Sequence, residues 1–129
     1  MYKRKIMDDL IAWKNDAGKK KALVIKGMRQ IGKTFIVKAF AEENYENVVY
    51  INFKDNESAK KIFDGDFVIN RITLDISALF PGTHFVPGKT IIIFDEVQEC
   101  ANARASIKAF MLDGRYDVIC TGSLYYKSL

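Results

Sequence analysis

Cysteine, histidine and proline are scarce in this chain of 129 residues, and long apolar runs are absent from it. Cys100 and Cys120 do not form a CxxC motif, and His84 is the single histidine, so neither a zinc site nor a disulfide framework is expected. Such sparing use of cysteine is typical of a reducing compartment. No apolar stretch approaches the roughly 18 residues that span a bilayer, and charges surround the few apolar residues of the N-terminus. We therefore expect a cytoplasmic protein with no signal peptide and no membrane anchor.

In other respects the composition is that of an ordinary globular protein. Hydrophobic residues make up 49% and charged residues 28% of the chain, which excludes the disordered and fibrous classes. A chain of this length accommodates one compact domain. A single domain over residues 1–129 is therefore expected.

Basic residues are concentrated in the first half of the chain. The net charge is +6 over residues 1–61 and −2 over residues 62–129. A basic half suits an anionic partner such as a nucleotide or a nucleic acid, although a solvated lysine surface is the simpler explanation. Charge alone does not identify the ligand.

Hydrophobic periodicity predicts an alternation of helices and strands. A leading segment of residues 1–17 contains an amphipathic helix over residues 5–14, whose Trp13 is expected in the core rather than beneath a nucleobase. Strands are expected over residues 22–25, 48–53, 90–94 and 117–121, and the continuous apolar run of residues 22–25 predicts a strand that is buried on both faces.

Further helices are expected between these strands. One covers residues 34–43, a second begins at Asp66 as its cap and ends at Pro81-Gly82, and a third begins at Asn102 and ends at Asp113-Gly114. The third helix is expected to bury Ile107, Phe110 and Met111. This alternation predicts an α/β fold in which helices cover both faces of a parallel sheet. Ligands of such sheets bind beyond the carboxyl ends of the strands.

The turn after the first predicted strand carries a phosphate-binding motif. Residues 27–34 match G-x-x-x-x-G-K-[ST], with a strand expected before them and a helix after them. The two glycines let successive backbone N–H groups face one concavity, and the helix adds its positive N-terminal end. Lys33 would reach the β- and γ-phosphates, and the Thr34 hydroxyl would bind Mg²⁺. The alternative is a glycine-containing surface loop with an exposed lysine. The residues expected to bind nucleotide are Gly27, Met28, Arg29, Gln30, Ile31, Gly32, Lys33, Thr34 and Phe35.

Polar residues also follow the third and fourth predicted strands. Asp95 comes directly after four large apolar residues, a position where a charged side chain is costly unless it has a function. Its carboxylate is expected to bind Mg²⁺. Glu96 could orient and deprotonate a water for attack on the γ-phosphate. Thr121 and Ser123, in a Thr-Gly-Ser turn, would lie beside the γ-phosphate and respond to hydrolysis, although such turns are common.

Two residues of the predicted site have ambiguous roles. Arg29 could contact transferring phosphate oxygens, or it could bind Glu99 or another acidic residue. Gln98 is either a polar contact near the nucleotide or a residue that starts a helix.

These motifs, in this order, resemble those of prokaryotic AAA-type P-loop ATPases. The matching segments are GMRQIGKT, INF, PGKTIIIFDEVQE and VICTGSL. The resemblance implies that Lys33 and Thr34 are the Walker A residues, Asp95 and Glu96 the Walker B metal residue and catalytic base, and residues 121–123 the sensor. The family's sheet has strand order 5-1-4-3-2, so the order 1-4-3-2 is expected here. By the resemblance, this chain would be an N-terminal fragment without the fifth strand and the helical lid.

The expected function is ATP binding and hydrolysis with Mg²⁺ by a switch or motor domain whose ligands are ATP and ADP. A small-molecule kinase with the same phosphate loop is one alternative, and a non-hydrolysing module that binds nucleotide or nucleic acid is another. Without a fifth strand, the strand over residues 22–25 would be a sheet edge with unpaired backbone groups, so self-association through this edge is also expected.

Overall fold

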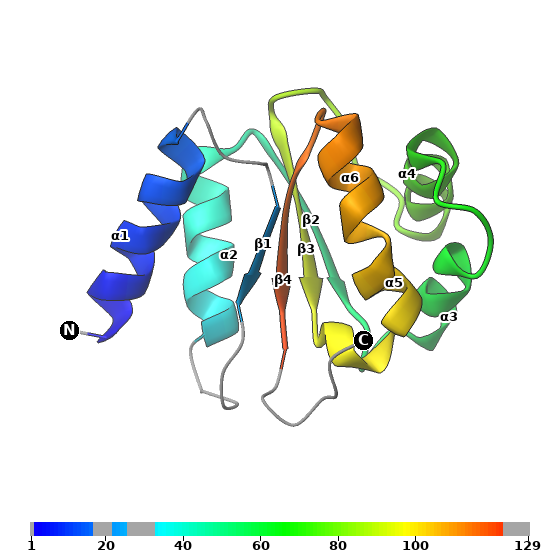
Figure 1. The fold of residues 1–129 in the computed structure, drawn as a ribbon, viewed down its shortest axis with the longest axis horizontal. Helices are drawn as coiled ribbons and strands as arrows, with labels where there is room; N and C mark the ends of the chain where they lie inside the picture. The colour runs from blue at the N-terminus through cyan, green and yellow to red at the C-terminus, as the bar shows by residue number, and fades with distance from the viewer. Residues whose placement is uncertain (1, 17–21, 26–32, 123–129) are drawn as a thin grey trace.

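The structure, a computed structural model, describes residues 2–16, 22–25 and 33–122. It comprises a parallel sheet with helices on both faces (Figure 1). Its elements are α1 (Tyr2–Asn15), β1 (Ala22–Ile25), α2 (Lys33–Asn44), β2 (Asn47–Asn52), α3 (Glu57–Lys60), η1 (Lys61–Phe63), α4 (Ile69–Leu79), β3 (Thr90–Asp95), η2 (Val97–Glu99), α5 (Ala101–Ala105), α6 (Ile107–Asp113) and β4 (Asp117–Thr121).

The four described strands are parallel and lie in the order β1-β4-β3-β2, which confirms the predicted order. Strand β3, one of the two inner strands, is buried along its whole length, as its apolar sequence predicts. Strand β1 was expected to be buried as well, but all four of its residues are only half-buried. Strand β3 lies between β4 and β2. Its pairing with β2 runs from Asn47 and Thr90 to Asn52 and Asp95. The carboxyl ends of all strands therefore meet at one edge of the sheet, the lower edge in Figure 1.

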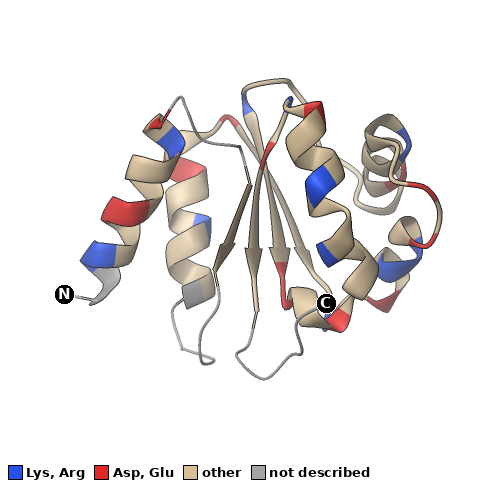
Figure 2. Ribbon diagram, in the orientation of Figure 1, with Lys and Arg blue, Asp and Glu red and all other residues tan. Residues whose placement is uncertain are grey.

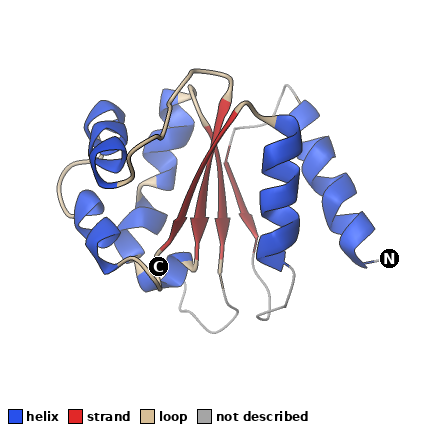
Figure 3. Cartoon of the chain, turned by 180° about the vertical axis from the view of Figure 1, so that it is seen from behind, coloured by secondary structure: helices blue, strands red, loops and turns tan. Residues whose placement is uncertain are grey.

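Two helical layers bury the two faces of the sheet. Helices α1 and α2 cover one face, and α3 to α6 cover the other, as the view from behind also shows (Figure 3). Successive side chains of β3 point alternately toward the two helical layers. Ile91 and Ile93 pack with Leu10 of α1 and Phe40 of α2, and the remaining buried members of this cluster are Ile36, Val37, Ala41 and Ile119. Trp13 packs, half-buried, against the same cluster, in the position expected of a core residue.

Phenylalanine rings dominate the core on the opposite face. Phe94 of β3 contacts Phe53, Phe63 and Phe110 edge to face, with ring centroids 5.4 to 5.9 Å apart. The short segment formed by α3 and η1, which the sequence analysis does not predict, is fixed to the sheet by Phe63. Its two turns are too short to show a helical period.

The expected starts of two helices are wrong. Asp66 does not cap α4, which begins at Ile69 with Val68 at the cap position. Instead, Asp66 Oδ1 accepts hydrogen bonds from the Val68 backbone N–H at 3.3 Å and from Arg71 Nε at 2.9 Å. Asn102 lies inside α5 rather than at its cap, and its side chain donates to Asp64 Oδ1 at 3.4 Å.

The helix expected from Asn102 to Asp113 is divided into α5 and α6 at Ser106. The Ser106 hydroxyl donates to the Ala103 carbonyl at 2.7 Å, so the side chain engages the backbone of the preceding turn. Ile107 and Phe110 are buried as predicted, while Met111 is only half-buried. The predicted end at Asp113-Gly114 is confirmed, because Gly114 takes the left-handed conformation that closes α6. No helix in the described ranges is both long enough and apolar enough to cross a membrane.

Candidate functional site

The polar residues at the carboxyl edge of the sheet lie on one face. Asp95 ends β3 on the same side as Ile91 and Ile93, because side chains two residues apart in a strand share a face. Thr121 ends β4 on the same side as Ile119 for the same reason. This is the face that α2 covers, and α2 begins at the same edge. Figure 2 shows the acidic stretch at the carboxyl end of β3.

The Asp95 carboxylate is the centre of the site. It is buried, with 4% of the residue exposed. Oδ1 accepts hydrogen bonds from the Thr121 hydroxyl and, at 2.9 Å, from the Glu96 backbone N–H. Oδ2 accepts hydrogen bonds from the Tyr50 hydroxyl and, at 3.1 Å, from the Thr34 hydroxyl. These donors fill the roughly four lone-pair sites of a carboxylate, which is how a buried charge is compensated.

Thr34 joins the phosphate motif to the acidic strand. It lies in the first turn of α2, where backbone N–H groups have no partner within the helix and attract negative charge. Its contact with Asp95 therefore places a hydroxyl and a carboxylate at the positive end of a helix. Two hard oxygen ligands are a set that Mg²⁺ accepts, since this ion usually takes one or two protein ligands and completes its shell with waters and phosphate oxygens. The residues present therefore fit a Mg²⁺ site.

Tyr50 is a site residue that the sequence analysis missed. Besides the contact with Asp95, its ring lies beneath Lys38 of α2, with Nζ 4.2 Å from the ring centroid. Burial, and then the hydrogen bond to Asp95, raise the pKa of the Tyr50 hydroxyl above its usual range, so this hydroxyl stays protonated as a donor. Tyr50 is paired with Ile93, which lies on the same face of the sheet as Asp95. The alternation of faces along β2 is the sequence pattern that could have indicated this position for Tyr50.

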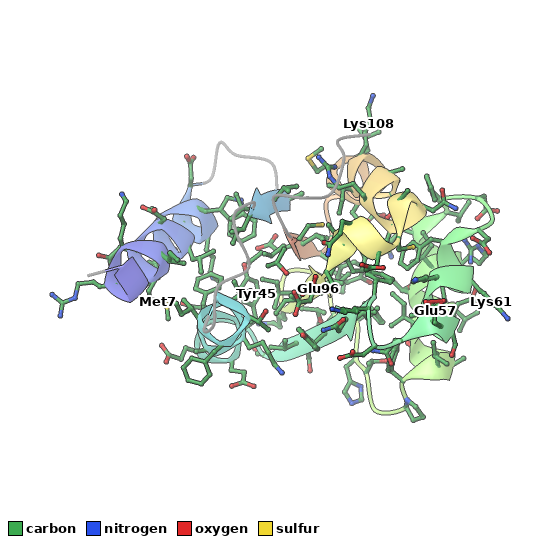
Figure 4. All side chains as sticks on the ribbon, turned by 90° about the horizontal axis from the view of Figure 1, so that it is seen from below. Met7, Tyr45, Glu57, Lys61, Glu96 and Lys108 are labelled. Carbon is green, nitrogen blue, oxygen red and sulfur yellow. The ribbon has the colours of Figure 1, made fainter. Side chains whose placement is uncertain are left out.

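Glu96 follows Asp95 in an unusual backbone conformation. Its φ of 54° and ψ of 46° are left-handed, and it is the only non-glycine residue with positive φ in the described ranges. Glu96 Oε1 accepts a hydrogen bond from Gln98 Nε2 at 2.6 Å. Viewed from the carboxyl edge, Glu96 lies near the middle of the molecule, between α2 and α5 (Figure 4).

Gln98 contacts Glu96 and lies in the short helix η2, as its predicted role at a helix start suggests, while its predicted contact near the nucleotide stays a prediction. The structure describes the other expected site residues only in part. Lys33 is the first residue of α2, and Phe35 is 70% exposed beside a groove of about 470 Å³ that Thr34 and Lys38 also line. The rest of the phosphate motif, including Arg29, and the predicted sensor residue Ser123 lie outside the described residues.

The chain matches a known family over most of its length. The AAA domain family matches residues 19–129. Among solved structures, PCH-2 of C. elegans matches with a TM-score of 0.58 and 18% identity over 99% of this chain. The match covers 38% of the PCH-2 chain. No curated protein sequence matches the chain.

The structural likeness supports the fold, and the family match covers the described sheet, α2 and the site around Asp95. The chain therefore belongs to the AAA domain family of P-loop ATPases.

Proposed function

We propose that this chain binds ATP with Mg²⁺ at the carboxyl edge of the sheet and hydrolyses it to ADP and phosphate. The observation that carries the proposal is the direct contact of Thr34, at the start of α2, with Asp95, at the end of β3. A P-loop ATPase needs a hydroxyl from its phosphate motif and a carboxylate from a neighbouring strand at one point. These two groups come from positions 61 residues apart in the chain.

Each residue has a role in the proposed reaction. Residues 27–32 and Lys33 bind the phosphates, and Thr34 and Asp95 hold Mg²⁺, which would neutralise charge on the phosphate oxygens. Glu96 accepts a proton from a water whose oxygen attacks the γ-phosphorus, while the bond from that phosphorus to the bridging oxygen breaks and ADP leaves. Thr121 and Ser123 respond to the change at the γ-phosphate, which lets the domain act as a switch or motor.

The phosphate motif can be tested by Lys33→Ala. Loss of this cation should reduce the affinity for ATP at least about a hundredfold, since a charge-assisted contact to phosphate contributes roughly 3 kcal/mol. Calorimetric titration of the chain with Mg²⁺ and ATP measures the change. Lys108→Ala is the matched control, because Lys108 is exposed on α6 and points away from Glu96 (Figure 4).

Unchanged ATP affinity in Lys33→Ala would contradict the assignment of the phosphate motif. A second measurement separates hydrolysis from transfer to an acceptor. An ATPase releases inorganic phosphate when water is the only acceptor, whereas a small-molecule kinase transfers the γ-phosphate to its acceptor and forms ADP and the phosphorylated acceptor without releasing inorganic phosphate.

A further inference from the structure

Tyr50 contacts Asp95 but has no part in the reaction proposed above. It lies in β2, which β4 and β3 separate from β1, the strand that precedes the phosphate motif. Because Tyr50 pairs with Ile93, its side chain reaches Asp95 diagonally across the β2 and β3 pair, a distance that a long aromatic side chain spans. The contact is thus a product of strand register rather than of a sequence motif.

The donors around Asp95 come from three directions. Thr121 reaches Oδ1 from β4, Tyr50 reaches Oδ2 from β2, and Thr34 reaches Oδ2 from α2. Since Asp95 is 4% exposed, water has little access to replace a donor that is removed. Among the described residues, loss of the Tyr50 hydroxyl would leave Oδ2 with the Thr34 hydroxyl alone, the group that is itself expected to bind the metal. In the part of the chain that the structure describes, Tyr50 is thus the one side-chain donor to Oδ2 that is not a predicted metal ligand.

The position of the Tyr50 ring is itself fixed by α2. Lys38 lies over the ring, with Nζ 4.2 Å from the centroid, and Lys38 is four residues after Thr34. Residues four apart share a face of a helix, so one face of α2 contacts both the carboxylate and the ring of the residue that holds it. The ring therefore cannot turn away from Asp95 without breaking its contact with Lys38.

We propose that Tyr50 is a positioning residue of the metal site, which orients the Asp95 carboxylate so that Asp95 and Thr34 present their oxygens together to Mg²⁺. This inference rests on the proposed function. Residues that hold metal ligands in place commonly change metal affinity by about 10- to 100-fold when they are replaced. Tyr50 acts through Asp95 and makes no contact with substrate in this scheme.

The test is Tyr50→Phe, which removes the hydroxyl and keeps the ring. The Mg²⁺ concentration that gives half-maximal binding of a fluorescent ADP analogue should rise about tenfold. Affinity for the same analogue in EDTA should be unchanged, because no Mg²⁺ is then present for Asp95 to bind. Thermal unfolding with and without Mg²⁺ gives a second readout, in which the stabilisation by Mg²⁺ should shrink.

Tyr45→Phe is the matched control. The Tyr45 hydroxyl also donates to a carboxylate, that of Asp117, and Lys14 Nζ lies 5.0 Å from its ring centroid. Asp117 begins β4 and Thr121 ends it. Since a parallel strand rises about 3.3 Å per residue, this contact lies about 13 Å from the site. Tyr45→Phe should lower stability and leave the Mg²⁺ midpoint unchanged.

The outcomes are distinct. An unchanged midpoint in Tyr50→Phe, with a loss of stability like that of Tyr45→Phe, would show a purely structural role and overturn the inference. A lower midpoint would show that Tyr50 competes with Mg²⁺ and would overturn it as well. If the unsubstituted chain binds the analogue with no dependence on Mg²⁺, the metal site of the proposed function fails and the role of Tyr50 fails with it. If that chain binds no nucleotide, the proposed function fails as a whole.

Discussion

Glu96 shows how a single residue connects the strand to the chemistry proposed for the site. A left-handed backbone costs a residue with a Cβ atom about 1–2 kcal/mol, so the surrounding structure must hold Glu96 in this conformation. Two hydrogen bonds hold Glu96 in this conformation, one from its backbone N–H and one to its backbone carbonyl. The Glu96 N–H donates to Asp95 Oδ1, and the Glu96 carbonyl accepts from the Glu99 N–H at 3.0 Å.

Glu96→Gln should keep nucleotide binding and lose hydrolysis. The amide retains the shape, and its oxygen can still accept from Gln98, but it cannot take the proton of the attacking water. The rate of phosphate release should fall at least about a hundredfold, the usual contribution of a general base. Single-turnover measurement of phosphate release checks this.

The control for this variant is Glu99→Gln, an exposed carboxylate three residues along the chain. It should hydrolyse ATP at the unsubstituted rate. Phosphate release by Glu96→Gln at that same rate would remove Glu96 from the role of base.

Among the secondary-structure elements, α6 shows how the conformation of a single residue ends a helix. α6 ends because Gly114 adopts a φ of 75° and its N–H donates to the Phe110 carbonyl at 3.0 Å. A Cβ at this position would meet only the Met111 carbonyl oxygen at 3.9 Å, an ordinary contact. The need for glycine is therefore one of backbone conformation rather than of space.

Gly114→Ala should lower the free energy of unfolding by about 1–2 kcal/mol, the cost of a left-handed residue with a Cβ. Gly65→Ala is the control, since a Cβ there meets only the Arg71 side chain at 3.7 Å and the backbone has no positive φ. It should change stability by less than about 1 kcal/mol. Denaturant titration followed by circular dichroism measures both. Equal stabilities of the two variants would contradict this account of the α6 end.

The helix starts illustrate what local sequence leaves undecided. Asp66 and Asn102 are both good capping residues, yet each uses its side chain elsewhere, Asp66 for Arg71 and Asn102 for Asp64. Capping propensity favours a set of positions, and the tertiary partners within reach select among them. The cap positions predicted for these two helices were therefore each wrong by two residues.

At the scale of the whole molecule, the position of β1 has a consequence for association. Within the described ranges, β1 pairs with β4 alone, and all four of its residues are half-buried. A strand edge with unpaired N–H and C=O groups is a template for another chain. We propose that the isolated 129-residue chain associates through this edge.

Sedimentation velocity over a wide range of protein concentrations tests the association. The average mass should rise with concentration for the 129-residue chain. A longer version that supplies a strand beside β1 should sediment as a monomer under the same conditions. A 129-residue chain that stays monomeric at every concentration would show that the β1 edge is closed to other chains.

Some features of this protein follow from the sequence alone. The alternation of strands and helices, the phosphate motif before α2 and the carboxylate at the end of β3 depend on residues close together in the chain, so periodicity and turn residues suffice to predict them. The parallel order β1-β4-β3-β2 was predicted through the family resemblance, and the structure confirms it.

Tertiary structure alone decided how the Asp95 carboxylate is held. The hydroxyl groups of Tyr50 and Thr121 come from strands 45 and 26 residues away, and each reaches Asp95 only because strand register brings its side chain to the same face. Local sequence sets which segments become strands and helices, whereas contacts between distant segments depend on how those elements pair, and one residue of slip in β2 would turn Tyr50 to the opposite face.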